Sequence, residues 1–118
     1  MESKTTNAPL SRCDSPQQLE AAIRALSGRW KPVILFHLFS AGRLRFSELH
    51  RLAEGVTHKV LTQQLRELER DGVVARAVFA EVPPRVEYRL TNAGYALLPA
   101  LRALNAWGAA SLGESTDA

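Results

Sequence analysis

The sequence predicts a mainly helical domain of the α+β class with one small β-hairpin. Three observations support this prediction. Apolar residues recur at intervals of three and four in several segments, and residues typical of helix caps precede those segments. The pattern changes over residues 86–90, where apolar residues alternate strictly with charged ones, as in a half-buried strand. A Pro-Pro pair shortly before that stretch marks a turn.

The length and composition are those of a single globular domain. The chain has 118 residues, of which 46% are apolar and 23% charged. Its longest dense apolar run, residues 32–39, falls far short of the roughly 20 residues that span a bilayer. Because it has a single cysteine and no apolar signal core, we expect a cytoplasmic protein with no membrane partner. We expect residues 1–12 to be a disordered tail, 13–113 to form the domain and 114–118 to be a second tail.

Two helices are expected in the first third of the domain. Ser15 is a good N-cap, Pro16 suits the first helical position, and Gln18 lies three residues past the cap. The helix that begins there carries one apolar stripe and ends at Gly28. A second helix is expected over residues 32–39, and because nearly every residue in it is apolar we expect it to be buried on almost all sides.

The next two helices are expected to form a helix-turn-helix. A short strand over residues 44–46 precedes a helix over 47–53, which Gly55 ends. Thr57 then caps a fourth helix that reaches Asp71. Leucines recur along one stripe of this helix and are expected to face the core: Leu61, Leu65 and Leu68.

A β-hairpin and a final helix complete the predicted domain. The strands are expected over residues 73–81 and 86–90, separated by a segment whose prolines lack the backbone donors that a ladder needs. Thr91 is a good cap for the last helix, whose apolar positions run to Trp107. Pro99 lies within that stretch, so either the helix kinks there or its first turn begins close by, and we expect a kink.

This order of elements describes a winged helix-turn-helix with one additional helix at each end. Its charge fits a nucleic-acid partner, because the net charge is +3 and arginine dominates among the 15 basic residues. Between Arg29 and Arg89 there are 11 basic and seven acidic residues. The planar guanidinium suits phosphate oxygens and guanine edges, although a basic balance is also typical of an ordinary solvated surface.

Four sequence strings match one known family in the same order. They are GRWKPVIL from Gly28, RFSEL from Arg45, LTQQLRELERDG from Leu61 and EVPPRVEYRLT from Glu81. On these strings the sequence resembles the HxlR-type branch of bacterial winged-helix transcription regulators, relatives of the MarR group. The resemblance implies a sequence-specific regulator that binds double-stranded DNA as a homodimer and needs no cofactor. Small departures, such as Phe79 where the family often has Tyr, touch no expected DNA-facing position.

The face of the fourth helix opposite its leucines is the candidate DNA-reading surface. Gln63 suits adenine, with which an amide forms two hydrogen bonds, and Arg66 suits guanine or a phosphate. Residues at the positive N-terminal end of the helix suit a phosphate. The alternative is a polar face that is merely solvated. The predicted recognition residues are Thr57, His58, Lys59, Thr62, Gln63 and Arg66.

Basic residues outside this helix are candidates for further DNA contacts. Arg85, beside the Pro-Pro tip, is expected to extend toward an adjacent minor groove, where narrow A·T-rich stretches attract arginine. The alternative for Arg85 is a salt bridge with Glu81 or Glu87, worth about 0–1 kcal/mol. The candidates for contacts to the DNA backbone are Arg43, Arg45 and Lys31.

Selective binding also predicts a dimer, because one winged helix reads few base pairs. Two copies related by a two-fold axis read inverted half-sites about one helical turn apart. The last helix carries more apolar surface than one domain face needs, and the first helix adds to it. The predicted interface comprises Leu19, Ile23, Leu97, Leu101, Leu104 and Trp107. A small molecule or an oxidant that favours one dimer state is a possible effector.

Cys13 is a candidate redox sensor. It lies two residues before a helix cap, and the positive end of a helix lowers the pKa of a nearby thiol. Some relatives in the resembled family sense oxidants or electrophiles with a cysteine near this place. The alternative is an unreactive thiol beneath the first helix.

Other classes of function find little support in the sequence. The spacing of His37, His50 and His58 fits no metal-binding pair, so we expect no metal site. Nucleotide-binding and hydrolase motifs are absent, so we expect no enzymatic activity. The remaining alternative is a winged-helix module for protein–protein interaction without DNA specificity. Such a module would have an acidic or apolar recognition face, whereas this one is basic and polar.

Overall fold

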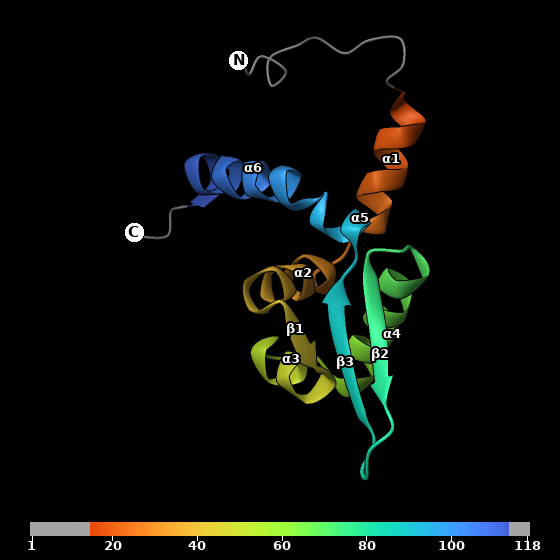
Figure 1. Cartoon of the computed structure of the whole chain (residues 1–118). Helices are drawn as coiled ribbons and strands as arrows, with labels where there is room; N and C mark the ends of the chain where they lie inside the picture. Colours follow the sequence, from red (N-terminus) through yellow and green to blue (C-terminus); the bar gives the residue numbers. More distant parts are fainter. Residues whose placement is uncertain (1–14, 114–118) are drawn as a thin grey trace.

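The computed structural model describes residues 15–113, and Figure 1 shows the path of the chain. The predicted α+β class, the helix-turn-helix and the hairpin are confirmed. The predicted tails and Cys13 lie outside the described residues. The elements in chain order are α1 (Pro16–Ala25), α2 (Trp30–Ala41), β1 (Arg43–Arg45), α3 (Phe46–Leu52), α4 (His58–Arg70), β2 (Val74–Phe79), β3 (Arg85–Leu90), α5 (Asn92–Tyr95), α6 (Leu98–Gly108) and a short π-helical end, η2 (Ala109–Gly113).

The sheet has three antiparallel strands in the order β1-β3-β2. β3 lies in the centre, pairing Arg89 with Arg43 of β1 and Leu90 with Val74 of β2. The hairpin that joins β2 to β3 extends well beyond the helices, and its tip is the lower end of the molecule in Figure 1. This projecting hairpin is the wing of the predicted fold.

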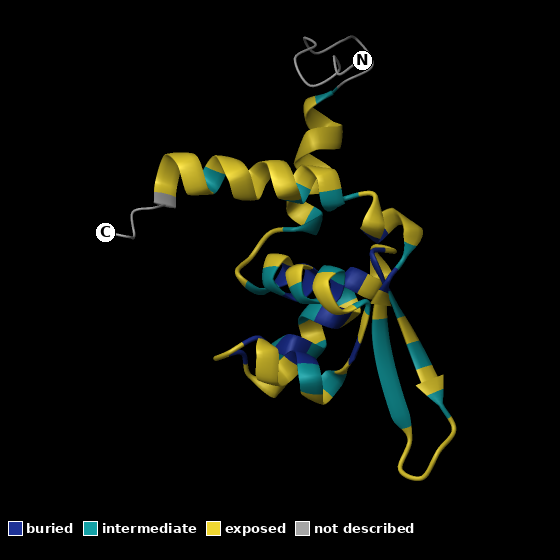
Figure 2. Ribbon diagram, turned by 60° about the vertical axis from the view of Figure 1, so that its left-hand side comes forward, coloured by how far each residue is buried: buried dark blue, intermediate teal, exposed yellow. Residues whose placement is uncertain are grey.

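One hydrophobic core lies among α2, the helix-turn-helix and the inner end of the sheet, as the buried residues in Figure 2 show. The leucine stripe of α4 faces it, as predicted. α2 is less buried than the sequence suggests, because its other side faces solvent and leaves Phe36 64% exposed. The core residues are Ile34, Leu35, Leu38, Leu44, Leu49, Ala53, Val56, Leu61, Leu65, Leu68, Val73, Val74 and Leu90.

Three predicted helix caps are confirmed. The hydroxyl of Ser15 accepts a hydrogen bond from the backbone N–H of Gln18, at 3.1 Å. Thr57 caps α4 through the N–H of Val60 at 3.1 Å, and Thr91 caps α5 through a backbone N–H at 3.0 Å. Each cap satisfies a backbone donor that the first turn of a helix leaves unpaired.

The C-terminal region differs from the predicted single kinked helix. The chain forms the four-residue α5, makes a turn and then begins α6, with Pro99 in the first turn of the new helix. A first-turn proline removes no intrahelical hydrogen bond, so the break costs less than a kink within a continuous helix.

α1 and α6 extend from the end of the domain opposite the wing tip (Figures 1 and 2). No residue of either helix is buried. Within the described part of the chain, every helix is too short or too polar to cross a bilayer.

Candidate nucleic-acid interface

The outward face of α4 has the orientation that the sequence predicts. Leu61, Leu65 and Leu68 are fully buried, and this fixes the rotation of the helix about its axis. The opposite side is polar and mainly basic, and Glu67 borders it beside Gln63. We call this surface the α4 outward face, and it comprises Lys59, Thr62, Gln63, Arg66 and Arg70.

The N-terminal end of α4 carries an aromatic cluster that sequence reasoning missed. The ring of His58 lies 4.5 Å from that of Phe46 and 6.0 Å from that of His50, measured between centroids. Phe46 and His50 belong to α3, so the cluster joins the two helices of the helix-turn-helix. Only the turn between the helices brings these residues together, and their spacing in the chain gives no signal of it. Thr57, His58 and Lys59 are exposed at this end, as expected for phosphate contacts.

Lys31 does not lie where a contact to the DNA backbone requires, and that prediction is wrong. α2 begins at Trp30, earlier than expected, so Lys31 belongs to its first turn. The Lys31 side chain lies against α4, and only 5% of the residue's surface is exposed. Its ammonium group lies 2.7 Å from a carboxylate oxygen of Glu67. The hydrogen bond and charge of Lys31 hold the pKa of Glu67 below its usual range. The other oxygen of Glu67 accepts a hydrogen bond from the Gln63 amide at 3.3 Å.

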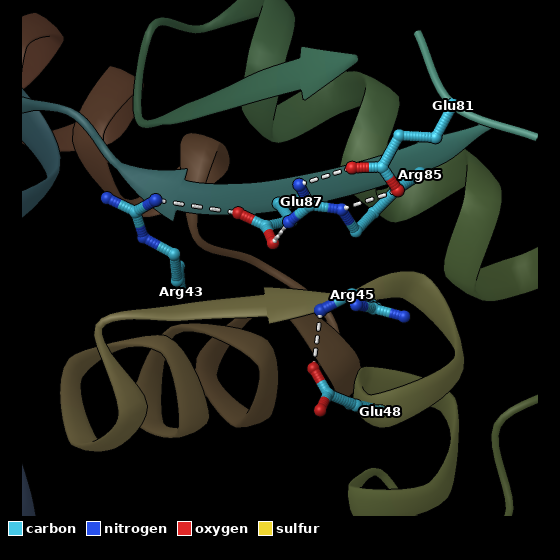
Figure 3. A network of polar contacts seen from close by, with 6 residues as sticks. All are labelled: Arg43, Arg45, Glu48, Glu81, Arg85 and Glu87. Carbon is cyan, nitrogen blue, oxygen red and sulfur yellow. Dashed lines mark hydrogen bonds and ion pairs between the residues drawn. The ribbon is translucent and has the colours of Figure 1, made fainter. Parts of the chain in front are cut away.

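Arg85 is held within the wing, as the alternative interpretation of the sequence proposed (Figure 3). Its guanidinium forms ion pairs with Glu81, at 2.8 Å, and with Glu87, and it stacks 4.0 Å from the centre of the Phe79 ring. The expected extension of Arg85 away from the protein is therefore wrong for this structure. Hydrogen bonds from Arg85 lower the pKa of Glu81. The same hydrogen bonds raise the pKa of Arg85.

Two arginines of β1 flank this network. Arg43 lies 3.5 Å from Glu87, yet its side chain stays 66% exposed. Arg45 is exposed as well. Its backbone N–H donates a hydrogen bond to the Glu48 carboxylate at 2.8 Å, and this contact caps the N-terminus of α3 (Figure 3). Both arginines therefore keep the accessible positions predicted for contacts to the DNA backbone.

A hollow of about 180 Å³ separates the α4 outward face from the hairpin. It is lined by Thr62, Arg66, Glu69, Arg76 and Tyr88. Arg66 has no acidic partner within residues 15–113, whereas Arg76 lies 3.7 Å from Glu69. Burial raises the pKa of Tyr88, so its hydroxyl stays protonated. Sequence reasoning missed Arg76, although strand alternation across from Tyr88 is the signal that places it here.

The predicted dimer surface divides into two groups. Leu19 and Ile23 of α1 and Leu104 and Trp107 of α6 are exposed, and Trp107 keeps 59% of its surface accessible. Leu97 and Leu101 are half-buried against the core of their own domain, so they offer less surface to a partner. Among residues 15–113, no three His, Cys, Asp or Glu side chains gather in a way that could hold a metal ion.

The model of one protein family, described as HxlR-like helix-turn-helix, matches residues 25–116. The chain belongs to this HxlR-like family. Over 91 residues it is 53% identical to YtcD of Bacillus subtilis, named as a transcriptional regulator of the helix-turn-helix type, and the match covers 77% of this chain and 71% of YtcD.

Solved structures of two regulators share the fold of this HxlR-like chain. The redox regulator HypR in its reduced form has a TM-score of 0.77 and 38% identity, over 81% of this chain and 94% of that one. The reduced form of the transcriptional regulator YodB from B. subtilis has a TM-score of 0.75 and 32% identity, over 85% and 96% of the two chains. The protein is a transcriptional regulator, as the sequence resemblance predicted.

Proposed function

We propose that this regulator binds an inverted-repeat DNA operator as a homodimer, with α4 of each protomer in the major groove. The α4 outward face supports the proposal most directly. Four of its five residues are exposed, and three of the five are basic. A helix held this way by a buried leucine stripe presents its polar side chains to base edges.

The surrounding elements supply positions for phosphate contacts on both sides of α4. The N-terminal end of the helix, at Thr57, His58 and Lys59, favours an anion because of its backbone donors and its dipole. Arg43 and Arg45 of β1 lie between α3 and the wing (Figure 3). Such contacts fix the register of the protein on the duplex, while Gln63 and Arg66 read the bases.

A second copy of the chain is the partner that we propose for α1 and α6. These helices have 10 and 11 residues and bury none of them. Isolated helices shorter than about 12–15 residues are marginal in water, so both need an apolar surface to pack against. The apolar residues that they expose, Leu19, Ile23, Leu104 and Trp107, lie away from the wing and leave α4 open to DNA.

The proposed DNA contacts are tested by band-shift titrations of Gln63→Ala and Arg66→Ala. Each variant should fold normally and lose discrimination at one base pair per half-site, worth about 1–3 kcal/mol. The duplexes come from a selection of bound sequences from a random pool. Arg102→Ala is the matched control, because it removes an exposed arginine from α6 instead of α4. Wild-type binding that shows no preference among duplexes would favour the alternative, a module for protein–protein interaction.

An oxidant effector acting through Cys13 extends the proposal. Its support is the structural likeness to HypR, which is named a redox regulator. Mild treatment with peroxide or diamide should modify Cys13 and change DNA affinity, which mass spectrometry and band shifts measure together. Cys13→Ser should abolish the change in affinity, and unaltered binding by the oxidised wild type would contradict the idea. Because the partner that we propose is DNA, we also propose that the protein acts in the cytoplasm.

A further inference from the structure

We infer that Lys31 and Glu67 position the amide of Gln63 for adenine, so that an ion pair between buried Lys31 and partly exposed Glu67 helps to set the base preference of α4. Neither residue touches DNA in this arrangement. The inference rests on the proposed function, because it concerns how the α4 outward face selects its operator.

A continuous chain of contacts leads from the interior to the α4 outward face. The side chain of Lys31, in the first turn of α2, is buried against α4, and its Nζ lies 2.7 Å from Oε1 of Glu67. Oε2 of the same carboxylate lies 3.3 Å from Nε2 of Gln63, one helical turn earlier on α4. The exposed amide is therefore tied to the most buried charged residue of the described chain.

The carboxylate determines which way the amide faces. The two ends of a glutamine amide have nearly the same shape, so an unrestrained amide samples both orientations. An ionised carboxylate only accepts hydrogen bonds, so it selects the orientation in which the NH₂ end of Gln63 points toward Glu67. Glu67 is ionised at neutral pH, because its ordinary pKa of 4.5 lies well below 7 and Lys31 lowers it further. The contribution of Lys31 to this arrangement is to hold the carboxylate in place through its 2.7 Å contact.

The groups that remain on Gln63 match adenine. After one N–H is donated to Glu67, the amide still has a second N–H and a carbonyl oxygen. In the major groove adenine presents the N7 acceptor beside the N6 amino donor, which pairs with those two groups, whereas guanine presents two acceptors. Holding the amide in this orientation before binding also reduces the conformational entropy lost on binding.

A purely structural role is the competing explanation, in which the ion pair only fastens α2 to α4. The two roles differ in their dependence on Gln63. A positioning role acts through the amide and vanishes when the amide is removed, while a fastening role persists in its absence. A double-mutant cycle between residues 63 and 67 separates them.

The experiment measures the ratio of affinities for adenine and guanine at the base pair that Gln63→Ala identifies. Glu67→Gln keeps the size of the side chain and removes the obligate acceptor. The pair Lys31→Met with Glu67→Leu removes both charges together, so no unpaired charge is left in the interior if Glu67→Gln folds poorly. Glu69→Gln is the matched control, because Glu69 lies on the same helix and pairs with Arg76, away from Gln63.

We expect Gln63→Ala to lose discrimination by roughly 5- to 150-fold. Glu67→Gln and the double-charge variant should each lose at least about threefold, and neither should lose more when combined with Gln63→Ala. Removing a negative charge raises the affinity for both duplexes alike, and this general gain cancels in the ratio of the two affinities. Glu69→Gln should therefore keep the wild-type ratio.

Two outcomes overturn the inference in distinguishable ways. A loss of discrimination that is the same with and without Gln63, or wild-type discrimination in both Glu67 variants, overturns the positioning role and leaves the proposed function intact. A Gln63→Ala variant that discriminates like the wild type overturns the base contact at residue 63, and this inference with it.

Discussion

Individual basic residues of this protein differ in how far their charge is already neutralised. Lys31 and Arg85 have acidic partners within the protomer, at 2.7 and 2.8 Å. Lys59 and Arg66 have none among residues 15–113. Only basic residues that neutralise phosphates release counterions and make binding depend on salt. The salt dependence of binding should therefore reflect the unpaired basic residues of α4 more than the net charge of the chain.

The acidic partners of Arg85 make a prediction about the wing. Glu81→Gln removes a negative charge near the expected DNA surface and frees the guanidinium from one partner. DNA affinity at low salt should rise, by about fivefold at most, because an exposed ion pair contributes up to about 1 kcal/mol. Band shifts at several salt concentrations measure the change. Glu20→Gln, the same change on α1, is the control, and an unchanged affinity for Glu81→Gln would show that the wing stays away from DNA.

The Lys31–Glu67 pair makes a prediction about acid stability. Its hydrogen bond lowers the pKa of Glu67 in the folded state below the ordinary value of 4.5. The resulting stabilisation is present above that ordinary value and is lost as pH falls through the lower folded value. Urea unfolding between neutral pH and pH ~3 should show a steeper loss of stability for the wild type than for Glu67→Gln. Parallel curves for the two proteins would mean that the pair adds nothing to acid stability.

Among the elements, the four-residue helix α5 is attached to the start of the sheet by hydrogen bonds and by one close backbone contact. Thr91 caps it, and the backbone N–H of Thr91 donates to the carbonyl of Val73 at 3.0 Å. Gly94 is buried against the same carbonyl, where no side chain fits. This contact fixes the direction in which the chain leaves the core toward α6.

Gly94→Ala should therefore destabilise the domain. The new methyl group would clash with the Val73 carbonyl oxygen and crowd Leu90, and forced overpacking typically costs about 1–3 kcal/mol. Gly108→Ala is the matched control, because a Cβ at that position of α6 meets no atom, and it should leave stability unchanged or raise it by up to about 1 kcal/mol. Urea unfolding measures both variants, and equal stabilities would contradict the close approach at Gly94.

Elements that depend on local signals could be predicted from the sequence, and those that depend on packing could not. The Thr57 cap and the leucine stripe of α4 are local, so both the helix and its outward face were predictable. Pro99 is compatible with either a kink within a helix or the first turn of a new one. The contacts that hold α5 against Val73 favour the second, and α6 begins there. The partner of Lys31 lies 36 residues away on another helix, so no spacing in the chain reveals it. Arg76 is an intermediate case, because strand alternation gives its side of the sheet but not its place beside Arg66.

The whole molecule separates its two proposed tasks between opposite ends. The wing and α4 form the end that we propose binds DNA, and α1 and α6 form the end that we propose binds a second copy (Figure 1). A change at one end should therefore leave the local structure of the other intact.

The association of two chains is tested by replacing Leu104 and Trp107 with serine. Both side chains are exposed in the protomer, so the domain should stay folded while sedimentation equilibrium shows a shift from dimer to monomer. Operator affinity should fall as the dimer dissociates, because each monomer then binds a half-site independently. Val78→Ser on β2 is the control, since Val78 is 60% exposed but lies on the hairpin. A variant that remains dimeric would place the interface elsewhere.

The absence of buried residues in α1 and α6 has a consequence for gene dosage. In the proposed dimer the exposed apolar side chains of these helices, such as Ile23 and Trp107, are covered only by another chain, so the competent species forms by a second-order reaction. When protomers are scarce, its abundance grows with the square of their concentration. A modest rise in expression then produces a disproportionate rise in promoter occupancy, and the regulator acquires a threshold without any effector.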